Sequence, residues 1–80
     1  MKPSYSKRTV DEAVQLLDVY ASQERGAGWM PLVSVGHALG VQRSSRTLAY
    51  KARGLPCANL EKTREDALEA AQRLREGWRP

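Results

Sequence analysis

The side chains best equipped to bind a ligand form one run, QRSSRTLAYKAR, at residues 42–53. This run lies inside a 34-residue stretch, residues 25–58, that carries five Lys and Arg residues and no Asp or Glu. The preceding residues 9–24 hold four acids and no base, and residues 59–80 hold five of each, so positive charge is concentrated in the middle. A basic surface without carboxylates suits a polyanion. The alternative interpretation is a weakly charged, loop-rich segment without a ligand.

Other chemistries lack the residues that they need. The chain has one cysteine, Cys57, and one histidine, His37, which excludes an internal disulfide and leaves no Cys/His set for zinc. No nucleophile, base and orienting group form a recognisable set, and the GAG at residues 26–28 lacks the Lys-Ser/Thr of a phosphate-binding loop. We therefore expect no enzymatic activity, no metal, no cofactor and no small-molecule ligand.

Neither a membrane span nor an export signal is expected. The uncharged run between Arg25 and Arg43 is broken by glycines and by Pro31, and it falls short of the ~18–20 continuous apolar residues of a span. The N-terminus has lysines but no apolar core of a signal peptide. We expect a cytoplasmic protein that does not bind membranes.

The spacing of apolar residues predicts an all-α domain of four helices over residues 9–80, preceded by a flexible basic arm at residues 1–8. Thr9 and Glu12 have the form of a capping box, so the first helix should begin there. It should end near residues 23–25, because the GAG follows.

The remaining helices are predicted with less sharp boundaries. One is expected over residues 32–39, although β-branched residues make a strand at residues 32–35 a competitor. The next begins at Gln42 or Ser44 and ends at Arg53. A long last helix covers residues 59–76.

Residues 32–54 have the features of two helices joined by a tight turn. Gly40 suits the turn, and Gly36 supplies a small residue where the two backbones cross. The pattern Leu39-Gly40-Val41-x-x-Ser44, followed by Ala49, resembles the helix-turn-helix of small Cro-like phage and plasmid repressors. One residue departs from the family: Arg46 stands where a β-branched apolar residue is usual. Two alternative registers are therefore considered for the third helix, and in the shifted one Leu48 takes the core position.

The resemblance implies that the third helix reads the major groove of double-stranded DNA. An Arg can grip guanine and a Gln adenine, each through two hydrogen bonds, whereas phosphate contacts position the protein without reading sequence. The usual register directs Gln42, Arg43, Ser44, Thr47 and Lys51 to DNA, and the shifted one directs Arg43, Ser45, Arg46 and Tyr50. The expected base contacts are Gln42, Arg43, Ser44, Arg46 and Thr47. The expected phosphate contacts are Lys7, Arg8, Ser45, Tyr50, Lys51 and Arg53, together with the amides at the start of the third helix.

The last helix has an apolar seam with two alternative uses. It packs within one chain, or it pairs with a second copy; a chain of 80 residues has a thin core and favours the latter. A homodimer would also place two recognition helices on two half-sites of an operator. The residues expected at the dimer interface are Leu60, Ala67, Leu68, Ala71, Leu74 and Trp78.

Three functions are compatible with these features. The first is a sequence-specific DNA-binding regulator, a dimeric repressor of a phage, plasmid or other mobile element. The second is a small inhibitor or adaptor that binds a nucleic-acid enzyme. The third is an excisionase-like architectural protein that bends DNA.

Overall fold

The computed structural model of this chain describes residues 5–24, 26–54 and 60–80, with side chains from Thr63 onward in the last segment. Within these residues the chain forms four helices: α1 (Lys7–Ser22), α2 (Leu32–Leu39), α3 (Arg43–Arg53) and α4 (Leu60–Arg75). The described residues contain no strand, which confirms the all-α prediction and excludes the alternative strand at residues 32–35. None of these helices combines the length and apolar character required to cross a membrane.

The first helix begins two residues earlier than predicted. Ser6, in extended conformation, is its N-cap, and the Thr9 backbone N–H donates to Ser6 Oγ at 3.1 Å. The hydroxyls of the two residues lie 2.9 Å apart. The predicted capping box of Thr9 and Glu12 is therefore wrong: Ser6 is the cap and accepts the Thr9 amide, and Glu12 is left for another partner. Lys7 and Arg8, expected in a flexible arm, form the first turn of a helix.

The connection between α2 and α3 is the tight turn that the sequence predicts. Gly40 ends α2 in the left-handed conformation, with φ of 67°. The N–H groups of Gly40 and Val41 donate to the carbonyls of His37 and Gly36 at 3.1 and 3.3 Å, which satisfies the last turn of α2. Three residues separate the two helices, and the second of them, Val41, is buried.

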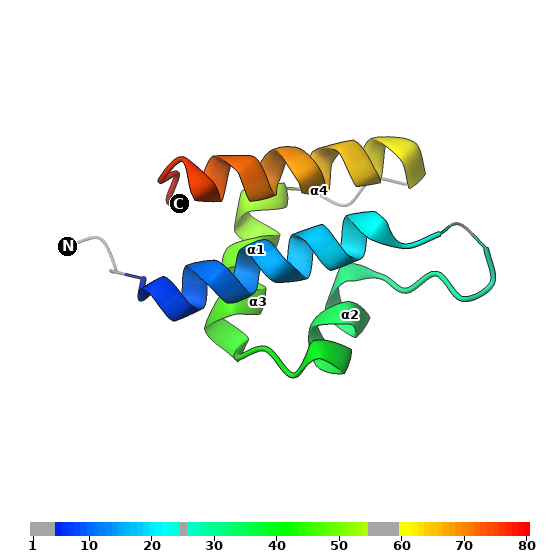
Figure 1. Ribbon diagram of the computed structural model, residues 1–80, viewed down its shortest axis with the longest axis horizontal. Coiled ribbons are helices and arrows are strands. Elements are labelled where there is room, and N and C mark those ends of the chain that lie inside the picture. The colour runs from blue at the N-terminus through cyan, green and yellow to red at the C-terminus, as the bar shows by residue number, and fades with distance from the viewer. Residues whose placement is uncertain (1–4, 25, 55–59) are drawn as a thin grey trace.

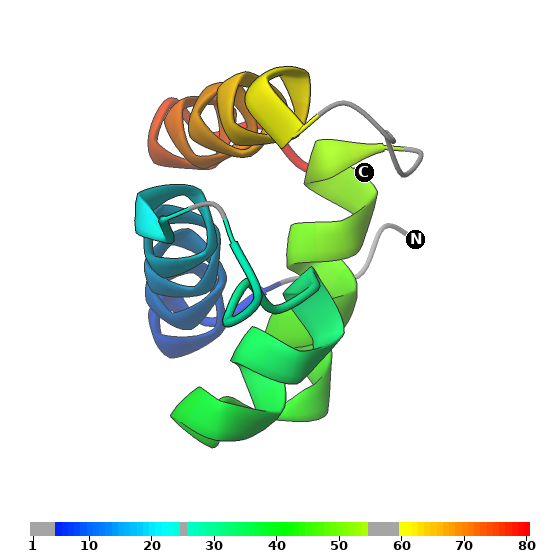
Figure 2. The same cartoon turned by 90° about the vertical axis from the view of Figure 1, so that its right-hand side faces the viewer.

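Three of the described helices form the body of the molecule, and the short α2 packs at its edge (Figure 1). α1 and α4 run side by side in opposite directions, and α3 crosses both of them. The perpendicular view separates α3 from the stacked α1 and α4 and places α2 at the lower end of the molecule (Figure 2). α2 and the turn after it lie on the side of α1 away from α4, with α2 packed on the C-terminal half of α1, whereas the C-terminal end of α3 reaches α4.

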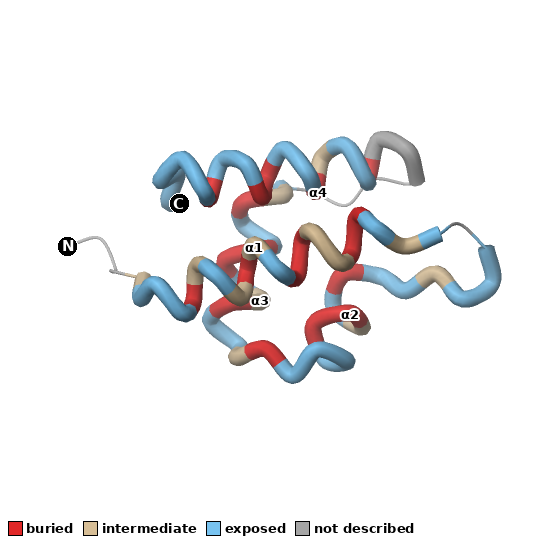
Figure 3. Tube along the Cα trace, viewed as in Figure 1, coloured by how far each residue is buried: buried red, intermediate tan, exposed pale blue. Residues whose placement is uncertain are grey.

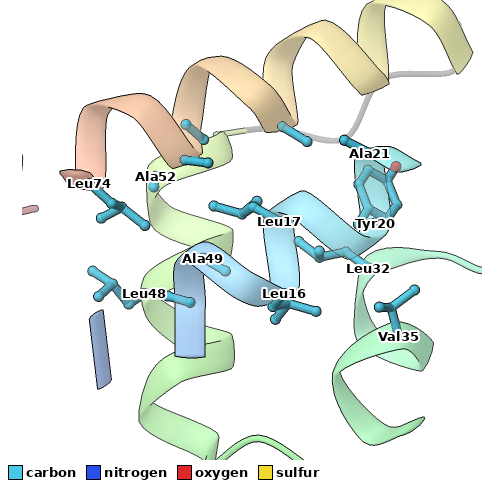
Figure 4. Close-up of a cluster of buried hydrophobic side chains, with 14 of the residues drawn as sticks. Leu16, Leu17, Tyr20, Ala21, Leu32, Val35, Leu48, Ala49, Ala52 and Leu74 are labelled. Atoms are coloured by element: carbon cyan, nitrogen blue, oxygen red, sulfur yellow. The ribbon is translucent and has the colours of Figure 1, made fainter. Parts of the chain in front are cut away.

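The core is built where these helices meet, and much of it is small. Among the residues whose side chains are described, fifteen apolar ones are buried and seven of these are alanines, which allows the helix backbones to approach closely. Leu16 and Leu17 of α1 converge with Leu48 of α3 and Leu74 of α4, and all four are fully buried (Figure 4). Buried positions recur along all four helices, whereas the end of α2 and the C-terminal residues are exposed (Figure 3).

Arginines of α4 attach it to the rest of the same chain. Arg64 donates to the Gln23 carbonyl at the end of α1 (2.7 Å), and Arg75 pairs with Asp18 of α1. Arg73 donates to the Ala52 carbonyl in the last turn of α3 (3.3 Å). Cations at the carbonyl ends of two helices are favourable for the helix dipoles.

Three of the six residues predicted at a dimer interface are instead buried within the chain. Ala67, Ala71 and Leu74 are buried against α1 and α3 of their own chain, because a thin core needs their apolar surface, and a second copy cannot reach them. Leu68 and Trp78 are exposed, at 48% and 36%. Asn59, where the last helix was expected to begin, lies outside the described residues, and so does the side chain of Leu60.

Candidate nucleic-acid interface

α3 has an apolar inner face and a polar outer face. Ser45, Leu48, Ala49 and Ala52 are buried against α1 and α4. The opposite face consists of exposed side chains without a carboxylate, and we call it the α3 outer face: Arg43, Ser44, Thr47, Tyr50 and Lys51. This face combines the two predicted registers: Ser44, Thr47 and Lys51 were expected on it in the usual register and Tyr50 in the shifted one. The buried Leu48 agrees with the shifted register.

Ser45 was expected to contact phosphate, and this prediction is wrong. Its side chain has no exposed surface, and its hydroxyl donates to Glu12 Oε1 of α1 at 2.8 Å. The same oxygen accepts the backbone N–H of Gln42 at 3.2 Å. Gln42 is the N-cap of α3 but makes no side-chain cap bond of its own. In a capping box, an acid at the third helical position, here Ser45, accepts the backbone N–H of the N-cap residue. Glu12 accepts this N–H from another helix instead.

The environment of Glu12 favours its charged form. The Ser45 hydroxyl is the largest influence that lowers its pKa below the ordinary 4.5, and the Gln42 amide and Arg8 act in the same direction. Partial burial opposes them. An ionised carboxylate at the positive end of the α3 dipole is also electrostatically favourable.

Arg46 packs its aliphatic stem against α2 and keeps its charged end at the turn between α2 and α3. Its side chain is half-buried, and its stem lies over Gly36 of α2: a Cβ placed on Gly36 would be 2.9 Å from Arg46 Cδ and 3.1 Å from Cγ. Its Nη1 donates to the Val41 carbonyl at 3.5 Å. The stem thus covers the helix crossing where a β-branched apolar residue is usual, and the charged end remains near the turn.

The N-terminal ends of α1 and α3 lie next to each other. Gln42 Nε2 donates to Thr9 Oγ1 at 3.3 Å, so the predicted base-contacting amide is engaged with α1. Lys7 pairs with Asp11 at 3.4 Å and Arg8 with Glu12 at 3.4 Å, and the two cationic side chains are 91% and 76% exposed. These two predicted phosphate contacts therefore stand close to the start of the α3 outer face.

At the C-terminal end of α3, the side chain of Arg53 packs on aromatic residues of the core. The guanidinium of Arg53 lies 5.2 Å from the ring centroid of Tyr20, which in turn meets Trp29 edge-on at 5.7 Å. Arg53 Nε is buried and makes no hydrogen bond. Arg53, a predicted phosphate contact, is therefore half-buried on an aromatic ring and is not part of the α3 outer face.

Two residues that organise this region were not predicted. Glu12 has no local signal, since its partners are 30 and 33 residues away. Gln23 holds the loop after α1, because its side-chain amide donates to the carbonyl of Met30 and accepts from its N–H, both at 2.8 Å. Neither role follows from residue type, because both partners are set by the tertiary fold.

Metal ligands do not gather elsewhere on the described surface, and a shallow hollow lies at the end of α1. No three His, Cys, Asp or Glu side chains come together in residues 5–24, 26–54 and 63–80 in a way that could hold a metal ion. The hollow, of about 360 Å³, lies over the loop at residues 23–28, away from the α3 outer face. No protein-family model, no curated protein and no solved structure matches this chain.

Proposed function

We propose that this protein is a sequence-specific regulator of transcription that binds double-stranded DNA in the cytoplasm and represses its target. α3 would enter the major groove with its outer face toward the bases. The Cro-like pattern of residues 39–49 supports repression in particular.

One observation carries the proposal: the exposed side of α3 is basic, polar and free of acids. Among the described residues, Arg43 and Lys51 form no ion pair, whereas Arg73 and Arg75 of α4 are paired with acids. Cations that are not neutralised within the protein are available to a polyanion.

The chemistry of each side chain suggests its role. Arg43, at the first helical position and exposed, has the fork of donors that matches guanine O6 and N7. Ser44 and Thr47 are short and exposed, which suits contacts to bases or to the sugar–phosphate backbone. Lys51, Lys7 and Arg8 would neutralise phosphates on either side.

A DNA titration with charge-matched variants tests the proposal. The purified protein is titrated onto a duplex from upstream of its own gene and onto a scrambled duplex, at two salt concentrations. Arg43→Ala should weaken specific binding by about 1–3 kcal/mol, roughly 5- to 150-fold, and affect the scrambled duplex much less. Lys51→Ala should weaken both and reduce the salt slope by about one.

Arg79→Ala is the matched control. It removes the same charge, but Arg79 donates only to carbonyls at the end of α4, those of Leu74 and Trp78. We expect this variant to bind as the wild type does. Equal, weak and salt-sensitive binding of wild type to both duplexes would refute sequence-specific regulation. Absence of binding would direct attention to a protein partner, and strong bending of the bound duplex would indicate an architectural role.

Stoichiometry from the same titration tests the homodimer. Two copies per palindromic site would require contacts other than the buried α4 residues. One copy per site would refute the homodimer expected from the sequence and leave the proposed DNA recognition intact.

A further inference from the structure

The start of α3 already holds an anion that belongs to the protein. Helix N-termini carry about half a positive charge and bind phosphates readily. Here the Glu12 carboxylate has taken that place, with Oε1 accepting from the Gln42 amide and the Ser45 hydroxyl. Its side chain is only 19% exposed, and Ser45 is fully buried, so the carboxylate is fixed by the core.

We propose that Glu12 determines specificity by excluding DNA phosphates from the N-terminus of α3. The inference rests on the proposed function, and it replaces the expectation that the first amides of α3 bind a phosphate. With the carboxylate in place, α3 would engage DNA through the side chains of its outer face.

The physical reason is that phosphate contacts and base contacts differ in whether they distinguish one DNA sequence from another. A phosphate bound by backbone amides contributes the same affinity on every sequence, because phosphates carry no base identity. A fixed negative charge at the same position repels a phosphate and removes that uniform contribution. The complex with random DNA, which depends on phosphate contacts, therefore weakens more than the complex with the specific site.

The neighbouring acid provides a matched control. Asp11 lies one residue before Glu12 on α1 and pairs with Lys7 as Glu12 pairs with Arg8, in both cases at 3.4 Å. Both acids thus restrain one cation of the first turn, and removal of either changes the net charge equally. Only Glu12 contacts α3.

The first experiment needs no DNA. Inorganic phosphate is titrated into the wild type, Glu12→Ala, Glu12→Gln and Asp11→Ala, and the backbone amide signals of residues 42–44 are followed by NMR. We expect these signals to shift in Glu12→Ala, less in Glu12→Gln, whose side chain still fills the position, and not in the other two proteins. Phosphate-induced shifts of these amides in the wild type would overturn the proposal, and that arm does not depend on any variant's folding.

The second experiment measures DNA binding by the wild type, Glu12→Gln and the matched control Asp11→Asn. Glu12→Gln should bind the scrambled duplex about three- to fivefold more tightly than Asp11→Asn does, with a salt slope steeper by about one. Its preference for the specific site should fall correspondingly. Equal effects of the two substitutions on both duplexes would show that Glu12 acts only through net charge and would refute the inference.

The two experiments separate the two proposals. If the wild type has no preference among duplexes, the proposed function fails, and the phosphate titration still decides whether Glu12 occupies an anion position. If the preference exists but Glu12→Gln retains it in full, the function stands and the role of Glu12 is refuted.

Discussion

The contact between Gly36 and Arg46 leads to a quantitative prediction about stability. Gly36 lies within α2, is buried, and faces the Arg46 stem across the helix crossing. Gly→Ala inside a helix normally stabilises a protein by about 0.5–1 kcal/mol, because alanine has less backbone freedom to lose. At this position the new Cβ would be 2.9 Å from Arg46 Cδ, closer than carbon atoms can pack, so the arginine must move.

The magnitude follows from the two opposing effects. A displaced, off-rotamer arginine costs about 0.5–1.5 kcal/mol, which cancels or exceeds the helix-propensity gain. The next neighbour, Leu16 Cδ2, would be at 3.5 Å, an ordinary contact, so the conflict is confined to Arg46. Gly36→Ala alone should therefore be neutral or destabilising by up to about 1 kcal/mol. In an Arg46→Ala background it should stabilise by about 0.5–1 kcal/mol.

A double-mutant cycle measures this coupling. Urea denaturation of the wild type, both single variants and the double variant, followed by circular dichroism, gives the four free energies of unfolding. We expect a coupling of about 1 kcal/mol, or 4–8 °C in thermal midpoint for a domain of this size. If Gly36→Ala stabilises both backgrounds equally, the Arg46 stem does not cover Gly36, and the explanation of the helix crossing fails.

Three further predictions concern the cap, the turn and the last helix. Because the pKa of Glu12 is lower in the folded state than in the unfolded chain, its contribution to stability is complete above the unfolded pKa, ordinarily 4.5, and is lost as pH falls through the folded pKa. Ser45→Ala removes the largest cause of that shift, so the denaturation midpoint of this variant should fall less steeply than that of the wild type between about pH 6 and pH 3; parallel curves would contradict the role of Ser45. Gly40→Ala should destabilise by about 1–2 kcal/mol in urea denaturation although its Cβ would meet nothing within 4 Å, since φ is positive; an unchanged midpoint would argue against this turn. Ala71→Leu should destabilise by about 1–3 kcal/mol through overpacking, whereas Leu68→Ala should change stability by less than about 0.5 kcal/mol and leave the sedimentation coefficient unchanged; the reverse order would restore the exposed seam.

The helices and the turn could be predicted because their signals are local. The stripe from Val10 to Ala21 and the Ala/Leu seam of α4 each repeat at helical spacing, and Gly40 marks a position that needs positive φ. The outer face of α3 followed from the same periodicity once the register was known. The register was decided by packing: Leu48 fills the core and Arg46 covers a glycine, a combination that pattern matching to Val41 and Ser44 does not contain.

The capping of the helices could not be predicted, because each cap has a choice of partners. Ser6 and Thr9 are both good N-caps three residues apart, and the choice of Ser6 frees Glu12. Glu12 then serves α3, some 30 residues away, a pairing that depends on how α1 and α3 cross. A carboxylate at residue 12 is compatible with the local box that Thr9 would begin and with the distant partner, so only the tertiary structure distinguishes the two.

The arginines show how the fold divides the cations into those that hold helices together and those that remain exposed. α4 has many cations, but Arg64, Arg73 and Arg75 are committed to carbonyls and carboxylates of the helices beneath them. These contacts hold α4 against the other helices, and they also engage its positive charges within the protein. On α3 the inner face is apolar and offers no acid to pair with, so Arg43 and Lys51 remain exposed without an ion pair among the described residues. Arg43 and Lys51 are therefore the cations of α3 that stand exposed without an acid partner, whereas the exposed Lys7 and Arg8 in the first turn of α1 are each paired with an acid.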